Sequence, residues 1–256
     1  MSSRLRHGLS VMSSLSASIL TAGRGVFVVR EAKQPEKPLI LYEYEGCPYC
    51  RRVREALTAL HLDVEIRPCP RGGKRFRPEA EAIGGKALFP FFIDENTGER
   101  LYESADIVRY LFRVYGEMEV PDAYRPGTPS FLLSGGATAI RSGRGIKARP
   151  SRAPEKPLSL TSFEGSPFSR LVRERMTELE LPYTLHNLGK EAFKELGPAT
   201  RRITPNPYIP KEGGKRYRFY QKHGRVQVPY LEDPNRGIAL FESTDIIDYL
   251  EKTYAL

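Results

Sequence analysis

Cysteine and tryptophan are scarce in this chain of 256 residues, which contains three cysteines and no tryptophan. Two of the cysteines share one Cys-x-x-Cys, so the chain lacks the even set of structural disulfides that is typical of small secreted proteins. No stretch approaches the roughly 18 uninterrupted apolar residues of a membrane-spanning helix. We therefore expect no membrane span and a reducing compartment, the cytoplasm in the first instance.

The charge of the chain is positive but is not concentrated in one place. The 40 lysines and arginines are scattered among 31 acidic residues, for a net charge of +9, whereas nucleic-acid-binding proteins gather their basic residues in a patch. We predict no nucleic-acid partner. The first 30 residues contain Arg4, Arg6, Arg24 and Arg30 and no acidic residue. This composition is also typical of an organelle transit peptide, which makes a plastid or mitochondrial location the alternative.

The chain contains an internal duplication. The segment KPLILYEYEGCPYC from Lys37 recurs as KPLSLTSFEGSPFS from Lys156, and FPFFIDENTGERLYES from Phe89 recurs as VPYLEDPNRGIALFES from Val228. The second copy is longer, mainly between about residues 189 and 212. The segment before each copy is also similar, GRGVFVVREAKQPEKP and GRGIKARPSRAPEKP. A repeat this long indicates duplicated domains, each with an arm before it.

Each copy predicts the same order of elements. In the first copy a strand at 39–44 is followed by a helix with Val53, Leu57 and Leu60 on one face, and by a strand at 64–66. A hairpin follows, with strands at 91–94 and 100–102 joined by a turn, and a last helix begins at Ser104. This α/β order is that of the thioredoxin fold. We predict an arm at 1–36, domain one at 37–118, a linker and arm at 119–155, and domain two at 156–256.

The motif Cys47-Pro48-Tyr49-Cys50 lies where the first strand gives way to a helix. Cys47 then occupies the N-cap and Pro48 the first helical position. Free backbone N–H groups and the positive helix end stabilise a thiolate there, and cysteines so placed have pKa values of about 3.5 to 7.5 instead of about 8.5. Cys50 lies one turn later on the same face. We predict Cys47 as nucleophile and Cys50 as resolving thiol, with Arg51 and Arg52 adding positive charge.

A structural zinc site is the alternative use of the two cysteines. Zinc needs four ligands at suitable spacing, and only Cys69 and four dispersed histidines remain to complete such a set. We therefore predict no metal. Cys69 itself, in Pro68-Cys69-Pro70, is either a third redox thiol near the same edge of the sheet or a small, partly buried residue.

The CPYC motif after a strand, the Phe-Pro and Val-Pro dipeptides and the Glu-Ser that opens a helix resemble glutaredoxins and the N-terminal domain of glutathione transferases. The resemblance covers both copies and is closest to proteins with tandem glutathione-transferase N-terminal domains. It implies cis peptide bonds at Pro90 and Pro229. The implied glutathione-binding residues of the first domain are Tyr49, Phe89, Pro90, Glu103 and Ser104. Glu103 and Ser104 would hold the γ-glutamyl end, although simple N-capping by Ser104 is the alternative.

The second copy replaces both cysteines of the motif by Ser166 and Ser169, so it cannot perform dithiol chemistry. Ser166 matches the place of a catalytic serine in some glutathione transferases, but serine is also a good N-cap. The residues of the second domain that the resemblance assigns to glutathione are Ser166, Val228, Pro229, Glu242 and Ser243. The chain is expected to lack the all-helical domain that completes a glutathione transferase, which argues against ordinary conjugation.

These observations predict a glutathione-dependent thiol-disulfide oxidoreductase, similar to glutaredoxin, with a redox-inactive second module. Glutathione would be its co-substrate, and its other partner a disulfide-containing protein or small molecule. Three alternatives remain open: a non-catalytic glutathione-binding or interaction protein, a glutathione transferase-like enzyme, and a protein that ligates an iron-sulfur cluster through Cys47 and glutathione.

Overall fold

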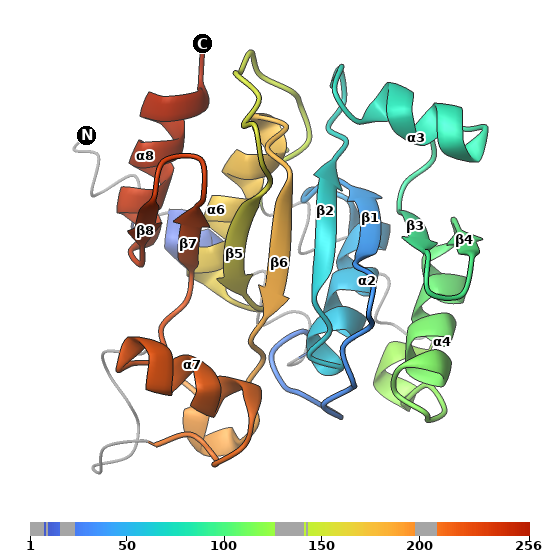
Figure 1. Ribbon diagram of the computed structural model, residues 1–256, viewed down its shortest axis with the longest axis vertical. Helices are drawn as coiled ribbons and strands as arrows, with labels where there is room; N and C mark the ends of the chain where they lie inside the picture. Colours follow the sequence, from blue (N-terminus) through green and yellow to red (C-terminus); the bar gives the residue numbers. More distant parts are fainter. Residues whose placement is uncertain (1–7, 9, 16–23, 126–140, 142, 198–208) are drawn as a thin grey trace.

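The computed structural model describes residues 8, 10–15, 24–125, 141, 143–197 and 209–256. Its centre is one mixed sheet of eight strands in the order β4-β3-β1-β2-β6-β5-β7-β8 (Figure 1). Parts of the expected arm at 1–36, of the linker at 119–155 and of the longer region at 189–212 lie outside the described residues. No helix in the described ranges is long and apolar enough to cross a membrane.

The first repeat contributes half of the sheet. Its elements are β1 (Leu39–Glu43), α2 (Pro48–Ala59), β2 (Val64–Pro68), α3 (Arg77–Gly84), β3 (Phe91–Asp94), β4 (Glu99–Leu101), α4 (Ser104–Val114) and the short helix η1 (Asp122–Tyr124). β1 runs parallel to β2 and antiparallel to β3. The predicted strands and helices are confirmed, and the stretch that the sequence left as a connection contains α3.

The second repeat follows the same order. Its elements are β5 (Leu158–Ser162), α6 (Pro167–Glu178), β6 (Tyr183–Asn187), η2 (Phe193–Glu195), α7 (Lys215–His223), β7 (Tyr230–Asp233), β8 (Ile238–Leu240) and α8 (Ser243–Tyr254). Again the first strand, β5, is parallel to β6 and antiparallel to β7. The two repeats therefore fold alike despite the changes in the CPYC motif.

The two halves of the sheet join through β2 and β6, which pair antiparallel. Glu65 pairs with Thr184, the residue that corresponds to it in the second repeat, and the neighbouring pairs are related in the same reciprocal way. An isologous contact between two copies of a chain has this reciprocity. The repeats are thus arranged as the two subunits of a symmetric dimer would be, within one chain.

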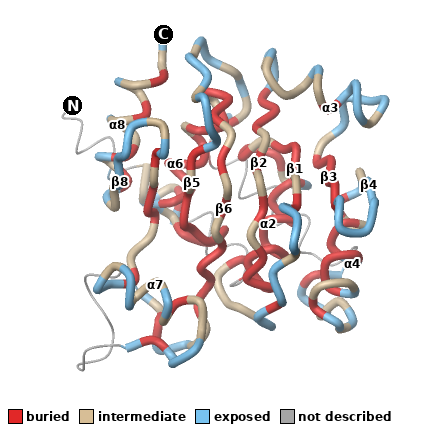
Figure 2. Tube along the Cα trace, in the orientation of Figure 1, coloured by how far each residue is buried: buried red, intermediate tan, exposed pale blue. Residues whose placement is uncertain are grey.

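The core lies mainly on one face of the sheet, between the strands and the helices α2, α4, α6 and α8 (Figure 2). Apolar residues from both repeats form one continuous cluster there, which includes Leu41, Leu57, Leu160 and Val172. A smaller cluster on the other face brings Tyr42 and Phe91 against Ala80 of α3. Continuity of the large cluster across the β2–β6 junction ties the repeats into one packed unit.

The arms are exchanged between the repeats. The N–H of Gly46, just before α2, donates to Gly145 O at 3.1 Å, and the N–H of Gly165, just before α6, donates to Gly25 O at 2.6 Å. Each arm therefore leaves its own repeat and packs where the helix of the other repeat begins. The residue before Cys47 is in this way bonded to the arm of the second repeat.

A Gly46→Ala substitution tests this arm contact. A Cβ at this position would collide with the Ile146 side chain and lie 3.0 Å from Arg144 O, so we expect a loss of about 1–3 kcal/mol in the free energy of unfolding by urea. The double variant Gly46→Ala/Ile146→Ala removes the obstacle and should lose less than the two single variants together. Additive losses would contradict the contact.

Candidate functional site

Cys47 is the N-cap of α2, with extended backbone angles (φ −88°, ψ 123°), and Pro48 opens the helix. The backbone N–H of Cys50 donates to Cys47 Sγ at 3.3 Å. The cysteine thus takes the cap position that serine or aspartate commonly fills, and its sulfur accepts a hydrogen bond at the positive end of the helix. All three cysteines are free thiols.

The surroundings of Cys47 favour its thiolate. The pKa of Cys47 is lowered to about 7, mainly by a hydrogen bond with the Cys50 side chain. Burial opposes this shift, whereas the backbone N–H groups of Cys50 and Tyr49 and the charge of Arg54 assist it. About half of a thiol with that pKa is ionised at pH 7, against about 3% of one with pKa 8.5. Cys47 is only 2% exposed, whereas Tyr49 beside it is exposed.

The cation with the main influence on Cys47 is Arg54, which sequence reasoning missed. The residues expected to supply this charge, Arg51 and Arg52, have their guanidinium groups engaged elsewhere. Arg51 Nε lies 3.7 Å from a carboxylate oxygen of Glu164, and Arg52 donates to a backbone oxygen at 3.3 Å. Arg54 follows Cys50 by four residues and so points to the same side of α2 as Cys50.

Cys50 has the opposite character. Its side chain is completely buried, and burial, together with its hydrogen bond to Cys47, raises the pKa of Cys50 well above its ordinary value. At neutral pH the pair therefore contains one sulfur that ionises readily and one that keeps its proton. This is the division of roles that a nucleophile and a resolving thiol require.

Strand pairing brings Phe89 to the dithiol. Phe91 of β3 pairs with Tyr42 of β1 in antiparallel register, so the residues just before β3 lie beside the turn that follows β1. The Phe89 and Tyr44 rings meet edge to face at 6.5 Å between centroids. The backbone N–H of Cys47 donates to Tyr44 O at 3.0 Å, so Phe89 packs on the turn that carries the dithiol.

Both predicted cis peptide bonds are present, Phe89–Pro90 in the first repeat and Val228–Pro229 in the second. The two prolines are buried and the residues before them are half-buried. The dipeptides occupy equivalent places, directly before β3 and before β7. The resemblance implies that the backbone of the residue before each cis proline pairs with glutathione, and this residue therefore has the same local geometry in both repeats.

The N-terminus of α4 lies at the same edge of the sheet. Glu103 is the N-cap and Ser104 the first helical residue, and the helix has no side-chain cap hydrogen bond. The interpretation of Ser104 as a simple N-cap is therefore wrong, and that of Ser243 is wrong for the same reason, since Glu242 is the N-cap of α8. An uncapped helix N-terminus presents backbone N–H groups that suit a carboxylate.

The glutamates of the two helix starts differ in their surroundings. Glu242 accepts a hydrogen bond from Gln227 at 2.6 Å. Glu103 is exposed, and its carboxylate has no hydrogen bond within the described parts of the chain. Both glutamates are exposed, and they differ in that only Glu242 has a hydrogen-bond partner among the described residues.

The second repeat reproduces the helix start without the thiols. Ser166 is the N-cap of α6 and accepts hydrogen bonds from the Ser169 N–H at 3.3 Å and from the Ser169 hydroxyl at 2.9 Å. Its oxygen is thus used in capping, as the structural interpretation of Ser166 predicts. The pair keeps the shape of the dithiol and loses its redox chemistry.

Cys69 has no hydrogen bond to the dithiol among the described residues. It is completely buried in the small cluster under α3, its thiol donates weakly to Arg67 O at 3.5 Å, and burial raises the pKa of Cys69 far above its ordinary value. A thiol that is neither exposed nor ionised is a poor nucleophile. These features favour the interpretation of Cys69 as a small buried residue.

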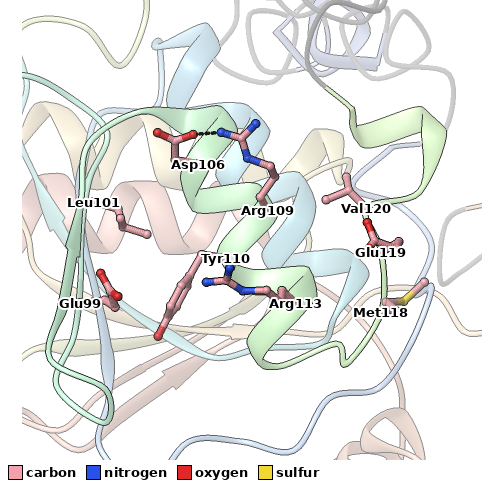
Figure 3. A pocket seen from close by; sticks show the side chains of 9 residues that line it. All are labelled: Glu99, Leu101, Asp106, Arg109, Tyr110, Arg113, Met118, Glu119 and Val120. Carbon is pink, nitrogen blue, oxygen red and sulfur yellow. Dashed lines mark hydrogen bonds and ion pairs between the residues drawn. The ribbon is translucent and has the colours of Figure 1, made fainter.

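Two other features lie away from the dithiol. Glu31, His61 and Glu191 bring three donor atoms within 4.8 Å of one another, but Glu31 already pairs with Arg218 at 3.1 Å. A hollow of about 350 Å³ lies at the outer edge of the first repeat, where Asp106 and Arg109 of α4 form an ion pair (Figure 3). Its lining contains none of the predicted site residues; it consists of Glu99, Leu101, Asp106, Arg109, Tyr110, Arg113, Met118, Glu119 and Val120.

The family model described as glutathione S-transferase, N-terminal domain, matches two stretches of the chain, residues 41–119 and 160–256. No curated protein matches.

Three solved structures are similar to parts of the chain. Glutathione transferase BmGSTD1 of Bombyx mori is 28% identical over 34% of this chain and 39% of its own, with a TM-score of 0.27. A delta-class glutathione transferase of Nilaparvata lugens is 28% identical over 36% of this chain and 41% of its own, with a TM-score of 0.28. Leishmania TDR1, a trimeric glutathione transferase, is 12% identical over 86% and 68%, with a TM-score of 0.29. This chain thus spans about two fifths of the length of the first two, and TM-scores below 0.5 add nothing to the family match.

Proposed function

The chain belongs to the glutathione S-transferase N-terminal domain family, and from this premise we propose that it is a glutathione-dependent thiol-disulfide oxidoreductase. Two thioredoxin-like modules in tandem, at 37–118 and 156–256, would divide the work, the first carrying the chemistry and the second being redox-inactive. The observation that carries the proposal is the unequal thiol pair at the start of α2, with Cys47 poised to ionise and Cys50 kept protonated. A reducing compartment such as the cytoplasm suits this pair.

The reaction proceeds by thiol-disulfide exchange. The Cys47 thiolate attacks one sulfur of a glutathione mixed disulfide or of a protein disulfide, a new S–S bond forms at Cys47, and the other sulfur leaves as a thiolate. In the monothiol route Cys47 is joined to glutathione, and a second glutathione thiolate attacks the glutathionyl sulfur, which releases the Cys47 thiolate and oxidised glutathione. In the dithiol route Cys50 attacks the sulfur of Cys47, the partner leaves as a thiolate, and two glutathione molecules then reduce the Cys47–Cys50 disulfide. In both routes the two electrons that reduce the substrate disulfide are finally recovered as oxidised glutathione.

Glutathione is proposed to lie across the edge where β1, β3 and the start of α4 meet. The backbone of Phe89 before its cis bond would pair with the cysteinyl part, and the exposed ring of Tyr49 would flank it. The uncapped N-terminus at Ser104 suits the γ-glutamyl carboxylate, and the open carboxylate of Glu103 suits its ammonium group.

Alkylation of Cys47 as a function of pH tests the proposal. Because only the thiolate reacts, the rate with iodoacetamide, a small reagent suited to a thiol that is 2% exposed, should rise with pH around a midpoint of about 7 and level off above it. A Cys50→Ala variant removes the main stabilising hydrogen bond and should raise the midpoint. A wild-type midpoint near 8.5, that of a free thiol, would refute the activated nucleophile.

A second candidate function is non-catalytic binding of glutathione by the second repeat. It is favoured by the cis bond of Val228–Pro229 and the uncapped helix at Ser243, both kept in a repeat that has lost its thiols. Calorimetry tests this second function. Two glutathione sites per chain would support binding by both repeats. A single site that disappears in a Pro90→Ala variant would mean that only the first repeat binds glutathione.

A further inference from the structure

Three side chains from distant parts of the chain converge at the end of α2 that lies opposite to Cys47. Glu31 lies in the arm before β1, His61 lies just past α2, and Glu191 lies in the loop after β6. One ring nitrogen of His61 and one carboxylate oxygen of each glutamate lie within 4.8 Å of one another. Imidazole nitrogens and carboxylate oxygens are both ligands of zinc.

Backbone hydrogen bonds hold the three segments together. The N–H of Ala32 in the arm donates to Leu60 O at 3.0 Å, at the end of α2. The N–H of Val28 in the same arm donates to Lys190 O at 2.9 Å, in the loop after β6. Each of these residues is close in sequence to one of the three side chains. The arm therefore brings a residue of the first repeat and one of the second to the same place.

His61 has a nitrogen lone pair that no hydrogen bond uses within the described residues. Its side chain is completely buried, and burial, with the charge of Lys215, lowers the pKa of His61 to about 3, so the ring is neutral. Nε2 lies 3.0 Å from Gly189 O. Because a carbonyl oxygen only accepts, Nε2 carries the proton and Nδ1 the lone pair. Nδ1 has no partner in the described part of the chain, which is the state of a histidine prepared for a metal.

The two carboxylates are only weakly engaged. Glu31 pairs with Arg218 at 3.1 Å, but the two side chains are 40% and 59% exposed, and exposed pairs of this kind contribute little. Glu191 accepts a long hydrogen bond from the N–H of Arg216, at 3.4 Å. Burial raises the pKa of Glu191, and the charge of Glu31 adds to this rise. A cation between the two carboxylates would relieve their repulsion.

The basic side chains nearby have other partners. Lys215 pairs with Asp63, and Arg216 pairs with Glu195 at 3.1 Å. Their charges are thus balanced by acidic groups outside the three. The two carboxylates of the group are left to balance the charge of a bound ion.

The second repeat shows a different use of the same position. Glu180 corresponds to His61, and both residues have a left-handed backbone, with φ of 48° and 53°. The Glu180 carboxylate accepts from the N–H groups of Lys74 at 3.2 Å and of Arg75 at 3.0 Å. It is therefore satisfied by the chain itself, whereas His61 keeps a free acceptor. Within the described residues no second group of three such donors occurs.

We propose that Glu31, His61 and Glu191 bind one zinc ion, with water as the fourth ligand; the inference is independent of the proposed function. Tetrahedral zinc with bonds of about 2.0 to 2.2 Å needs its ligand atoms about 3.4 Å apart, so the group closes by at most about 1.4 Å. Glu31 is exposed and free to make this movement. The nitrogen ligand favours zinc over magnesium or calcium, which prefer oxygen.

The ion would tie the arm and the first repeat to the loop of the second, and so would stabilise their junction. The expectation of no metal rested on the cysteines and on ligand spacing. The three residues of this site are too far apart in the chain to form a motif.

Titration with Zn²⁺ in competition with a chromophoric zinc indicator tests the site. The full chain carries Cys47→Ser and Cys50→Ser as background, because the thiols could also bind zinc. We expect one Zn²⁺ per chain. Glu31→Gln and Glu191→Gln should each weaken binding at least about tenfold, and neither side chain is fully buried, so both variants should fold. Arg218→Gln removes the competitor of Glu31 and should strengthen binding, which a purely structural role of these residues does not predict.

Glu117→Gln is the matched control, because Glu117 is an exposed glutamate that pairs with another arm residue, Arg30, at 3.5 Å. It should leave the affinity for zinc unchanged. Zinc should also raise the urea midpoint of the background chain, and Glu191→Gln should abolish this gain. The inference is overturned if the background chain binds no zinc, or if both glutamate variants bind it as tightly as the control.

Discussion

A Cys47→Ser variant is expected to lose at least about a thousandfold of the disulfide-reducing activity of the chain, because a hydroxyl does not ionise near neutral pH and cannot replace the thiolate. The helix should survive the change. Ser166 already caps α6 in the second repeat, where its oxygen accepts the Ser169 N–H at 3.3 Å, the same length as the bond from Cys50 to Cys47. A loss of activity would therefore reflect the missing thiolate and not a loss of the helix.

The measurement is the reduction of a glutathione mixed disulfide, with oxidised glutathione detected through NADPH and glutathione reductase. Cys69→Ala is the matched control, since it removes the other thiol of the first repeat, which is completely buried on the opposite face of the sheet from the main core, and it should keep most of the activity. Activity in Cys47→Ser equal to that of the control would exclude Cys47 as the nucleophile and favour the binding function.

A Glu164→Ala variant is expected to destabilise the whole chain by about 3–5 kcal/mol, because it leaves buried arginines without their counter-charge. Glu164 Oε2 accepts from Arg54 Nε of the first repeat at 2.8 Å and from Arg173 Nη2 of the second at 2.9 Å. Its side chain is 2% exposed. Conversely, Glu45 of the first repeat accepts a hydrogen bond from Arg173 of the second repeat at 2.9 Å. A glutamate of each repeat therefore pairs with an arginine of the other.

Urea unfolding of the wild type and the variant measures this loss. Asp122→Ala is the control, because Asp122 forms an exposed ion pair with Arg125 and such pairs contribute about 0–1 kcal/mol. Burial by itself raises the pKa of Glu164, but the charges of Arg173 and Arg54 outweigh burial and hold this pKa far below its usual range. This stabilisation is therefore present at neutral pH and is lost progressively as pH falls below about 4.3, the ordinary pKa of glutamate, and down through that low value. A change as small as that of the control would mean that the arginines find other partners.

The sequence of the first repeat was sufficient to predict the position of the reactive pair. A strand, a Cys-Pro step and a 3.6-residue periodicity are local signals, and together they place Cys47 at a helix N-cap. The duplicated motifs likewise predicted the order of elements in both repeats, and the family resemblance implied the two cis bonds. The sequence did not reveal α3 and α7, since residues 70–84 and 209–224 carry many charges and glycines and only a weak apolar pattern.

What the sequence determined by itself was thus local or repeated: the element order, the helix cap at Cys47 and the loss of thiols at Ser166 and Ser169. The tertiary structure alone decided how the repeats meet. Antiparallel pairing of β2 with β6, the exchange of arms at Gly46 and Gly165, and the partners of Arg54 all join residues far apart in the chain. Whether a charged residue is buried, and against which partner, depends on the assembled core. For that reason a CPYC motif visible in the sequence acquires its cation and its neighbouring arm only in the folded protein.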